Sequence, residues 1–114
     1  MQESQAIAAF SALSEPTRLA ILRFLVTRGP EGAPAGEIGT AVGFTSSRGA
    51  FHLAALTRAG LLTSEKVSRQ VIYRADFAGL GALADYLIRD CCGGDPRVVA
   101  CCTPAGARGP DEEC

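Results

Sequence analysis

Hydrophobic residues recur at helical spacing through the first quarter of the chain. The stretch 4–13 places Ile7, Phe10 and Leu13 on one face, which predicts a short helix. The segment Ser14-Glu15-Pro16 then gives a helix-start signal, with a capping residue ahead of a proline. A second helix is therefore predicted from Pro16 to Arg28, and its many apolar residues suggest burial on most sides.

Two shorter helices are predicted after a loop rich in glycine and proline (29–36). The first runs from Pro34 to Val42, and Gly43 stands where its C-terminal stop is expected. The second runs from Ser46 to Ala59, with leucines pointing inward. Two short helices joined by a turn of about three residues form a helix-turn-helix, whose second helix is the candidate reader of the DNA major groove.

The periodicity changes in the run 61–75, where apolar and polar positions alternate and β-branched residues are frequent. This pattern predicts a pair of strands with a turn near Val67–Gln70. A last helix is expected from a cap at Asp76 to about Cys91. Its apolar side is wide: Phe77, Leu80, Leu83, Ala84, Leu87, Ile88 and Cys91.

Glycine, proline and charge dominate from Gly93 onward. We therefore expect one domain over residues 1–92 and a flexible, cysteine-containing tail over residues 93–114. A length of 114 residues with 47% apolar content suits a single packed domain. The apolar runs are too short for a membrane span, and the N-terminus lacks the basic segment of a secretory signal, so a cytoplasmic protein is expected.

The net charge of −1 argues by itself against a nucleic-acid-binding protein, but the distribution of charge argues for one. Residues 45–75 hold five basic side chains and a single acidic one, Glu65, so this segment carries +4 and the remainder −5. A basic segment on an acidic body is expected where one face meets phosphates. The alternative is chance clustering of charge on a solvated face.

The order of helix, helix, helix-turn-helix, two-stranded wing and helix resembles that of the ArsR/SmtB family of metal-sensing repressors. Three segments carry the resemblance: FSALSEPTRLAILRFL (10–25) is similar to the family's second helix, FTSSRGAFHLAALTRAGLL (44–62) to its recognition helix, and RQVIYRA (69–75) to its second wing strand. The resemblance covers roughly residues 5–90. It implies a mainly α winged helix-turn-helix with a β-hairpin wing.

The same resemblance implies a homodimer built mainly from the first and last helices, which presents two recognition helices to operator DNA. The wide apolar face of the last helix agrees with a dimer. The alternative is that this face completes the core of the monomer.

Candidate DNA contacts lie at the start of the predicted recognition helix and on the wing. Ser46 and Ser47 offer hydroxyls and a helix N-terminus to phosphate oxygens, and Arg48 can bond two acceptors on a guanine edge. Arg69, near the wing tip, is a candidate for a phosphate or minor-groove contact, and Lys66 can assist. The alternative for Arg58 and Arg74 is solvated surface charge, and we favour it for Arg58.

Four further residues of this helix depart from the family or are ambiguous. Ala50 and Phe51 occupy positions where the family usually carries polar contacts, and Gly49 is unusual there. His52 matches a family position, which suggests a phosphate contact or a packed structural residue rather than a metal ligand.

All five cysteines lie in the last quarter of the chain: Cys91, Cys92, Cys101, Cys102 and Cys114. Cytosolic thiols are kept reduced, so clustered cysteines indicate a metal-binding or redox-active site before they indicate disulfides. The best-known arsenic-sensing branch of the family carries Cys-Val-Cys before the recognition helix, but the matching region 31–39 has no thiol. The last helix also lacks the paired histidine and acidic ligands of the family's zinc sensors.

What remains resembles a second arsenic-sensing branch, in which adjacent cysteines end the last helix and another follows in the tail. Cys91 and Cys92 match the first element, and either Cys101 or Cys102 would supply the third thiolate. Soft thiolates suit trivalent arsenic, and the Gly-Gly-Asp-Pro run at 93–96 suits the return of the chain. Cys114 is interpreted as incidental.

The sequence thus predicts a repressor that binds operator DNA as an apo dimer without a cofactor and dissociates when As(III) or Sb(III) binds. One rival is a thiol-oxidation or persulfide switch on the same fold. Structural disulfides and a four-thiolate zinc site are further alternatives, although adjacent cysteines fit tetrahedral zinc poorly. A thiol-based metal-handling protein is the last, and because no base, nucleophile or cofactor motif accompanies the cysteines, no enzymatic activity is expected.

Overall fold

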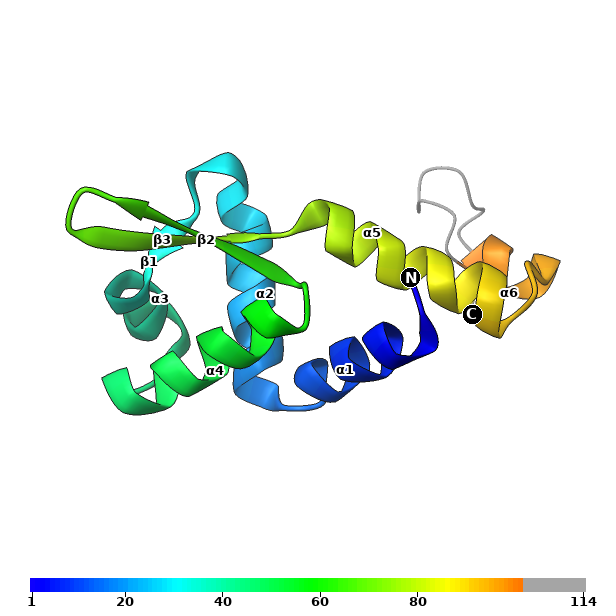
Figure 1. Cartoon of the computed structure of the whole chain (residues 1–114), viewed down its shortest axis with the longest axis horizontal. Helices are drawn as coiled ribbons and strands as arrows, with labels where there is room; N and C mark the ends of the chain where they lie inside the picture. Colours follow the sequence, from blue (N-terminus) through cyan, green and yellow to red (C-terminus); the bar gives the residue numbers. More distant parts are fainter. Residues whose placement is uncertain (102–114) are drawn as a thin grey trace.

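The computed structural model describes residues 1–101. In this range the chain folds into helices around a small antiparallel sheet, with one helical arm that extends from the body (Figure 1). The elements in chain order are α1 (Glu3–Leu13), α2 (Pro16–Arg28), η1 (Gly29–Glu31), β1 (Ala33–Pro34), α3 (Ala35–Val42), α4 (Ser46–Arg58), β2 (Leu62–Val67), β3 (Gln70–Ala75), α5 (Phe77–Asp85), η2 (Tyr86–Cys91) and α6 (Pro96–Cys101).

Helix α2 has the predicted bounds, and Glu15, directly ahead of Pro16, is its capping residue. The Glu15 carboxylate accepts a hydrogen bond from the backbone N–H of Arg18 at 2.8 Å, whereas the Ser14 hydroxyl donates to the Ser11 carbonyl. The expectation that α2 is buried on most sides is wrong for this chain alone. Leu19 and Val26 remain exposed, because the core of the body covers only the opposite side.

The predicted helix-turn-helix is confirmed as α3 and α4, and Gly43 ends α3 in the left-handed conformation at φ 90°. Leu53 and Leu56 of α4 point into the core as expected. Ile21 and Leu25 of α2 join them there, fully buried. The recognition helix is therefore fixed to the body by its apolar side.

The wing is confirmed, with β2 and β3 paired antiparallel from Leu62–Ala75 to Val67–Gln70 and Ser68 and Arg69 in the turn. The loop predicted at 29–36 instead holds the 3₁₀ turn η1 and strand β1, which pairs with β3 and gives the sheet order β1-β3-β2. Gly32 makes this third strand possible, since a Cβ there would collide with the Tyr73 carbonyl.

Helix α1 contributes only small residues to the core. Ala6, Ala9 and Ala12 are buried, whereas Ile7 and Phe10 are 60% and 41% exposed. The predicted helix is confirmed, but its larger apolar side chains face outward from this chain.

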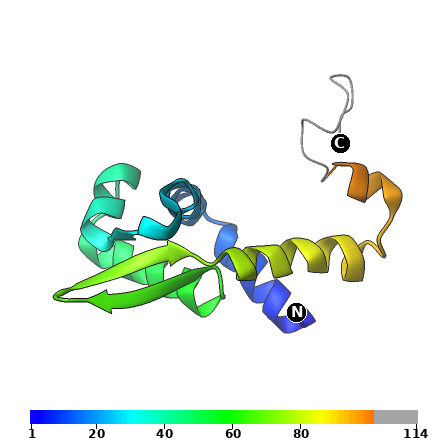
Figure 2. The same cartoon turned by 90° about the horizontal axis from the view of Figure 1, so that it is seen from above.

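The last long helix starts at the predicted cap, where the Asp76 carboxylate accepts a hydrogen bond from the Gly79 N–H at 2.9 Å. It continues from α5 into the π-helical turn η2, which ends at Cys91, and α5 and η2 together form the arm. Leu83 is the one residue of α5 that is buried. The others are not, because most of this helix extends beyond the body (Figures 1 and 2).

Within the predicted tail, Pro96–Cys101 forms helix α6. Asp95 holds its start, accepting hydrogen bonds from the backbone and side chain of Arg97. These bonds lower the pKa of Asp95 and raise the pKa of Arg97. Cys102 and Cys114 lie outside the described residues.

Candidate nucleic-acid interface and thiol segment

The N-terminal part of α4 presents the predicted polar residues to solvent. Ser46, Ser47 and Arg48 are exposed, as is Ala50 on the same helix. Phe51 is 61% exposed, which is unusual for an aromatic ring on a single-domain surface. This helix therefore offers hydroxyls, a guanidinium and an apolar ring to one surface.

The unusual glycine of this helix has a packing cause. Gly49 is buried, and a Cβ at this position would overlap the ring of Phe44, which enters between α3 and α4. The same ring would lie 2.9 Å from a Cβ at Gly39 of α3. The two glycines let α3 and α4 pack closely against the ring. Gly49 is therefore explained by the packing between the two helices of the helix-turn-helix.

His52 is largely buried, with a side chain only 14% exposed. Its Nδ1 accepts a hydrogen bond from the Nε–H of Arg18 on α2 at 3.1 Å. The Glu15 carboxylate lies 3.9 Å from the same Nδ1. These contacts favour the interpretation of His52 as a packed residue, and they join the start of α2 to the middle of α4.

The pKa of Glu15 lies below its usual value. The backbone hydrogen bond from Arg18 is the largest cause, and the nearby His52 contributes as well. Glu15 is therefore held in its charged form at the helix start, where a carboxylate is also favoured by the helix dipole.

The wing presents two exposed basic residues, Lys66 and Arg69, near its tip. Neither forms an ion pair with another described residue. Arg74, by contrast, pairs with Glu65 at 3.1 Å and donates to the Pro30 carbonyl at 2.8 Å. These contacts give Arg74 a structural role, because they join the wing to η1.

The cysteines lie at the far end of the arm. Cys91 is an exposed free thiol at the end of η2, and Cys92 beside it is half-buried. Gly93 and Gly94 follow with φ of 61° and 70°, both left-handed, in the segment where the sequence led us to expect a turn. Cys101 is half-buried at the end of α6, on the returning segment.

Residues 1–101 contain no group of three His, Cys, Asp or Glu side chains close enough together to hold a metal ion. A three-thiolate site there would need movement of the segment after Gly94 or a sulfur from Cys102, outside the described residues. Thiolates are ligands that a soft metal or metalloid ion prefers.

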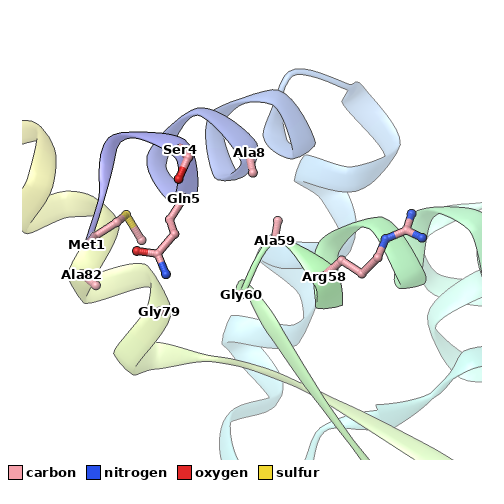
Figure 3. Close-up of a pocket in the computed structure, with 9 residues that line it drawn as sticks. All are labelled: Met1, Ser4, Gln5, Ala8, Arg58, Ala59, Gly60, Gly79 and Ala82. Atoms are coloured by element: carbon pink, nitrogen blue, oxygen red, sulfur yellow. The ribbon is translucent and has the colours of Figure 1, made fainter.

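A cleft of about 550 Å³ marks the place where α1, the end of α4 and the start of α5 meet (Figure 3). Met1 and Gln5 line one side, and Gly60 and Gly79 line the other. Gly79 packs so closely on the Gly60 carbonyl that a Cβ would collide with it. The arm is thus seated directly on the residues that end the recognition helix.

Comparisons with known proteins give the family. A helix-turn-helix domain family matches residues 13–65. The uncharacterized HTH-type transcriptional regulator YbzH of Bacillus subtilis is 33% identical over 93 residues, which cover 71% of this chain and 93% of that protein. The structure of an ArsR-like transcriptional regulator from Rhodococcus sp. RHA1 is 35% identical, with a TM-score of 0.70 over 85% of this chain and 89% of that one. The chain belongs to the ArsR family of winged-helix transcriptional regulators.

The structure of a possible transcriptional regulator for arsenical resistance is also similar, at 30% identity and a TM-score of 0.57 over 64% of this chain and 73% of that one. As an ArsR-family regulator the chain is a DNA-binding protein, and its relatives are regulators rather than enzymes. None of the helices within residues 1–101 has the length and apolar character that a bilayer span requires.

Proposed function

We propose that this ArsR-family regulator is a homodimeric repressor that binds operator DNA without a cofactor and releases it when trivalent arsenic or antimony binds its C-terminal thiolates. The observation that carries the proposal is the adjacent pair Cys91 and Cys92 at the end of the arm, followed by a glycine turn that reverses the chain toward Cys101. The similarity to a possible regulator for arsenical resistance supports this choice of effector. A regulator acting on an operator would work in the cytoplasm.

The exposed apolar residues of α1 and the arm support the dimer. Ile7 and Phe10 lie on α1, and Phe77 and Leu87 lie on α5 and η2, all at least 41% exposed. Apolar side chains of this size gain free energy when a second copy removes them from water. A two-fold dimer would present two recognition helices to successive turns of DNA.

Exposure and charge support the DNA contacts. The hydroxyls of Ser46 and Ser47 and the guanidinium of Arg48 face solvent at the start of α4, with Lys66 and Arg69 on the wing. Phe51 and Ala50 would contact apolar base groups such as the thymine methyl. His52 would act by packing, or through its second nitrogen on a phosphate.

Capture of arsenite would be an exchange of ligands without oxidation. Each thiolate forms an As–S bond, and the displaced hydroxyl leaves as water after taking up a proton. Cys91 and Cys92 would supply two sulfurs, and Cys101 or Cys102 the third. The product is a neutral arsenic centre that ties the returning segment to the end of the arm.

Binding can weaken DNA affinity only if the metalloid prefers a state of the dimer that does not bind DNA. The contact of Gly79 with Gly60 offers a route, since it seats the arm on the end of α4. A rotation of the arm in the dimer would therefore reorient the recognition helix.

The test is a fluorescence-anisotropy titration of operator DNA under reducing conditions, with arsenite, zinc or a mild oxidant added. Arsenite should weaken DNA binding of the wild-type protein by about 5–150-fold, the range of typical allosteric coupling. Cys91→Ser and Cys92→Ser should bind DNA normally and lose this response, whereas Cys114→Ser, the matched control, should keep it. Release by the oxidant but not by arsenite would reject the metalloid and favour a redox sensor, for which the exposed Cys91 thiol is a suitable first target.

A further inference from the structure

We propose that Arg18 of α2, outside the helix-turn-helix and the wing, is an additional DNA contact that His52 and Phe51 hold on the recognition surface. The inference rests on the DNA-binding part of the proposed function and is independent of the effector. Arg18 lies thirty-four residues before His52 in the chain, so only the fold brings it to this surface.

Two contacts fix the position of the Arg18 guanidinium. Its Nε–H donates to His52 Nδ1 at 3.1 Å, and its Cζ lies 5.4 Å from the centre of the Phe51 ring. The second distance is within the range of a cation–π interaction. The Phe51 and His52 rings also meet edge to face, 5.9 Å apart. The side chain is thus oriented before any ligand arrives.

The remaining donors of Arg18 are available. A guanidinium has five N–H donors, and within residues 1–101 the hydrogen bonds of this side chain use only the Nε–H. Glu15, the nearest acid in this cluster, is engaged with the backbone N–H of Arg18 and forms no ion pair with its guanidinium. Both Nη groups can therefore donate to a phosphate oxygen.

The basic residues of the described chain divide into two sets. Arg28, Arg74, Arg89 and Arg97 each pair with a carboxylate. The basic residues without such a partner among residues 1–101 are Arg18, Arg23, Arg48, Arg58, Lys66 and Arg69, and three of them, Arg48, Lys66 and Arg69, are predicted DNA contacts. Arg18 therefore shares the electrostatic character of the predicted DNA contacts.

The surface beside Arg18 is hollowed. A cavity of about 430 Å³ opens between the start of α2 and α4, lined by Glu15, Ser47, Arg48, Phe51 and His52. Two of these residues hold Arg18, and two others are candidate phosphate contacts. A sugar-phosphate unit lying here would meet the Ser47 hydroxyl and the Arg48 guanidinium, beside the Arg18 guanidinium that Phe51 and His52 hold.

The experiment compares Arg18→Gln, Arg18→Lys and a matched control, Arg89→Gln, on a labelled duplex that the wild-type protein selects from random sequence. Glutamine keeps a donor for His52 but removes the charge, and Arg89 is a 75% exposed arginine on the arm. Affinity is measured over a series of salt concentrations. Arg18→Gln should bind about tenfold more weakly and show a shallower plot of log affinity against log salt, by about 0.9 for each phosphate that the variant no longer neutralises.

Arg18→Lys should keep the wild-type salt slope, and Arg89→Gln should match the wild type in both quantities. An unchanged slope in Arg18→Gln overturns the proposal, even where affinity falls, because Arg18 would then act only by supporting His52.

If circular dichroism shows that Arg18→Gln does not fold, phenylglyoxal labelling of arginines in the wild-type protein provides the test instead. DNA should protect Arg18 but not Arg89, and equal labelling of Arg18 with and without DNA rejects the contact. A wild-type protein that binds no duplex would instead refute the proposed function.

Discussion

The ring of Phe44 occupies the angle between α3 and α4, where it lies against two glycines. Gly49 sits in the recognition helix, in which glycine normally costs up to about 1 kcal/mol relative to alanine. The packing of the Phe44 ring offsets that cost, because any residue larger than glycine at position 49 would overlap the ring. At the scale of single residues, the distance between the two helices of the helix-turn-helix is therefore set by the Phe44 ring and by the lack of a side chain at Gly49.

Gly49→Ala should lower the free energy of unfolding by about 1–3 kcal/mol, since the added methyl overlaps the Phe44 ring and forces the helices apart. Urea unfolding followed by circular dichroism measures the loss. Gly36→Ala is the matched control, because it also lies in a helix but its added methyl meets nothing within 4 Å. It should be neutral or stabilising by up to about 1 kcal/mol. A Gly49→Ala protein as stable as the Gly36→Ala protein would contradict the packing argument.

At the scale of elements, the wing depends on a two-residue turn that lacks glycine. Ser68 occupies its first position with φ 57°, which an L-residue adopts only at a cost. Hairpins tolerate such positions because their strands then twist correctly. The pairing of the two strands therefore imposes the conformation of Ser68, and it places Arg69 at the tip of the wing.

Ser68→Gly should stabilise the wing, because glycine adopts positive φ without steric cost. We expect the free energy of unfolding to rise by as much as about 1 kcal/mol. Thermal unfolding measures the gain, and Ser64→Gly, on the extended strand β2, should be destabilising instead. A loss of stability in both variants would show that the Ser68 conformation carries no strain.

At the scale of the whole molecule, the body and the arm have different roles. The body buries a core between α2, α4 and the sheet, whereas most of the arm extends away from it and gives the molecule extents of 47 × 33 × 23 Å. The partly buried Tyr86 lies near the start of α1. Burial raises the pKa of Tyr86, and the negative charge of Glu3 raises it further. An extended arm with exposed apolar residues is suited to pairing with a second copy.

Leu87→Glu should convert the protein from a dimer to a monomer, because two carboxylates would face the apolar surfaces that the partner covers. Sedimentation equilibrium measures the molecular mass. Val71→Glu is the control, as Val71 is equally exposed at 41% but lies on the wing. It should remain dimeric. A dimeric Leu87→Glu protein would place the interface elsewhere than on the arm.

The sequence by itself determined the order and type of the main elements. Apolar spacing, proline at the start of α2, Gly43 after α3 and Asp76 before α5 are local signals, because a cap or a helical face depends on residues a few positions apart. The same holds for the glycine turn after Cys92 and the positions of the five cysteines. Membership of a helix-turn-helix family also follows from such local motifs.

Only the tertiary structure decided what depends on residues distant in the chain. The strand β1 forms because β3, about forty residues further along the chain, lies beside it. Gly49 is explained by a ring from the preceding turn, and Arg74 is held by contacts across the wing and to Pro30. Above all, Arg18 reaches the recognition surface through His52, thirty-four residues away, a distance over which no periodicity in the sequence carries information.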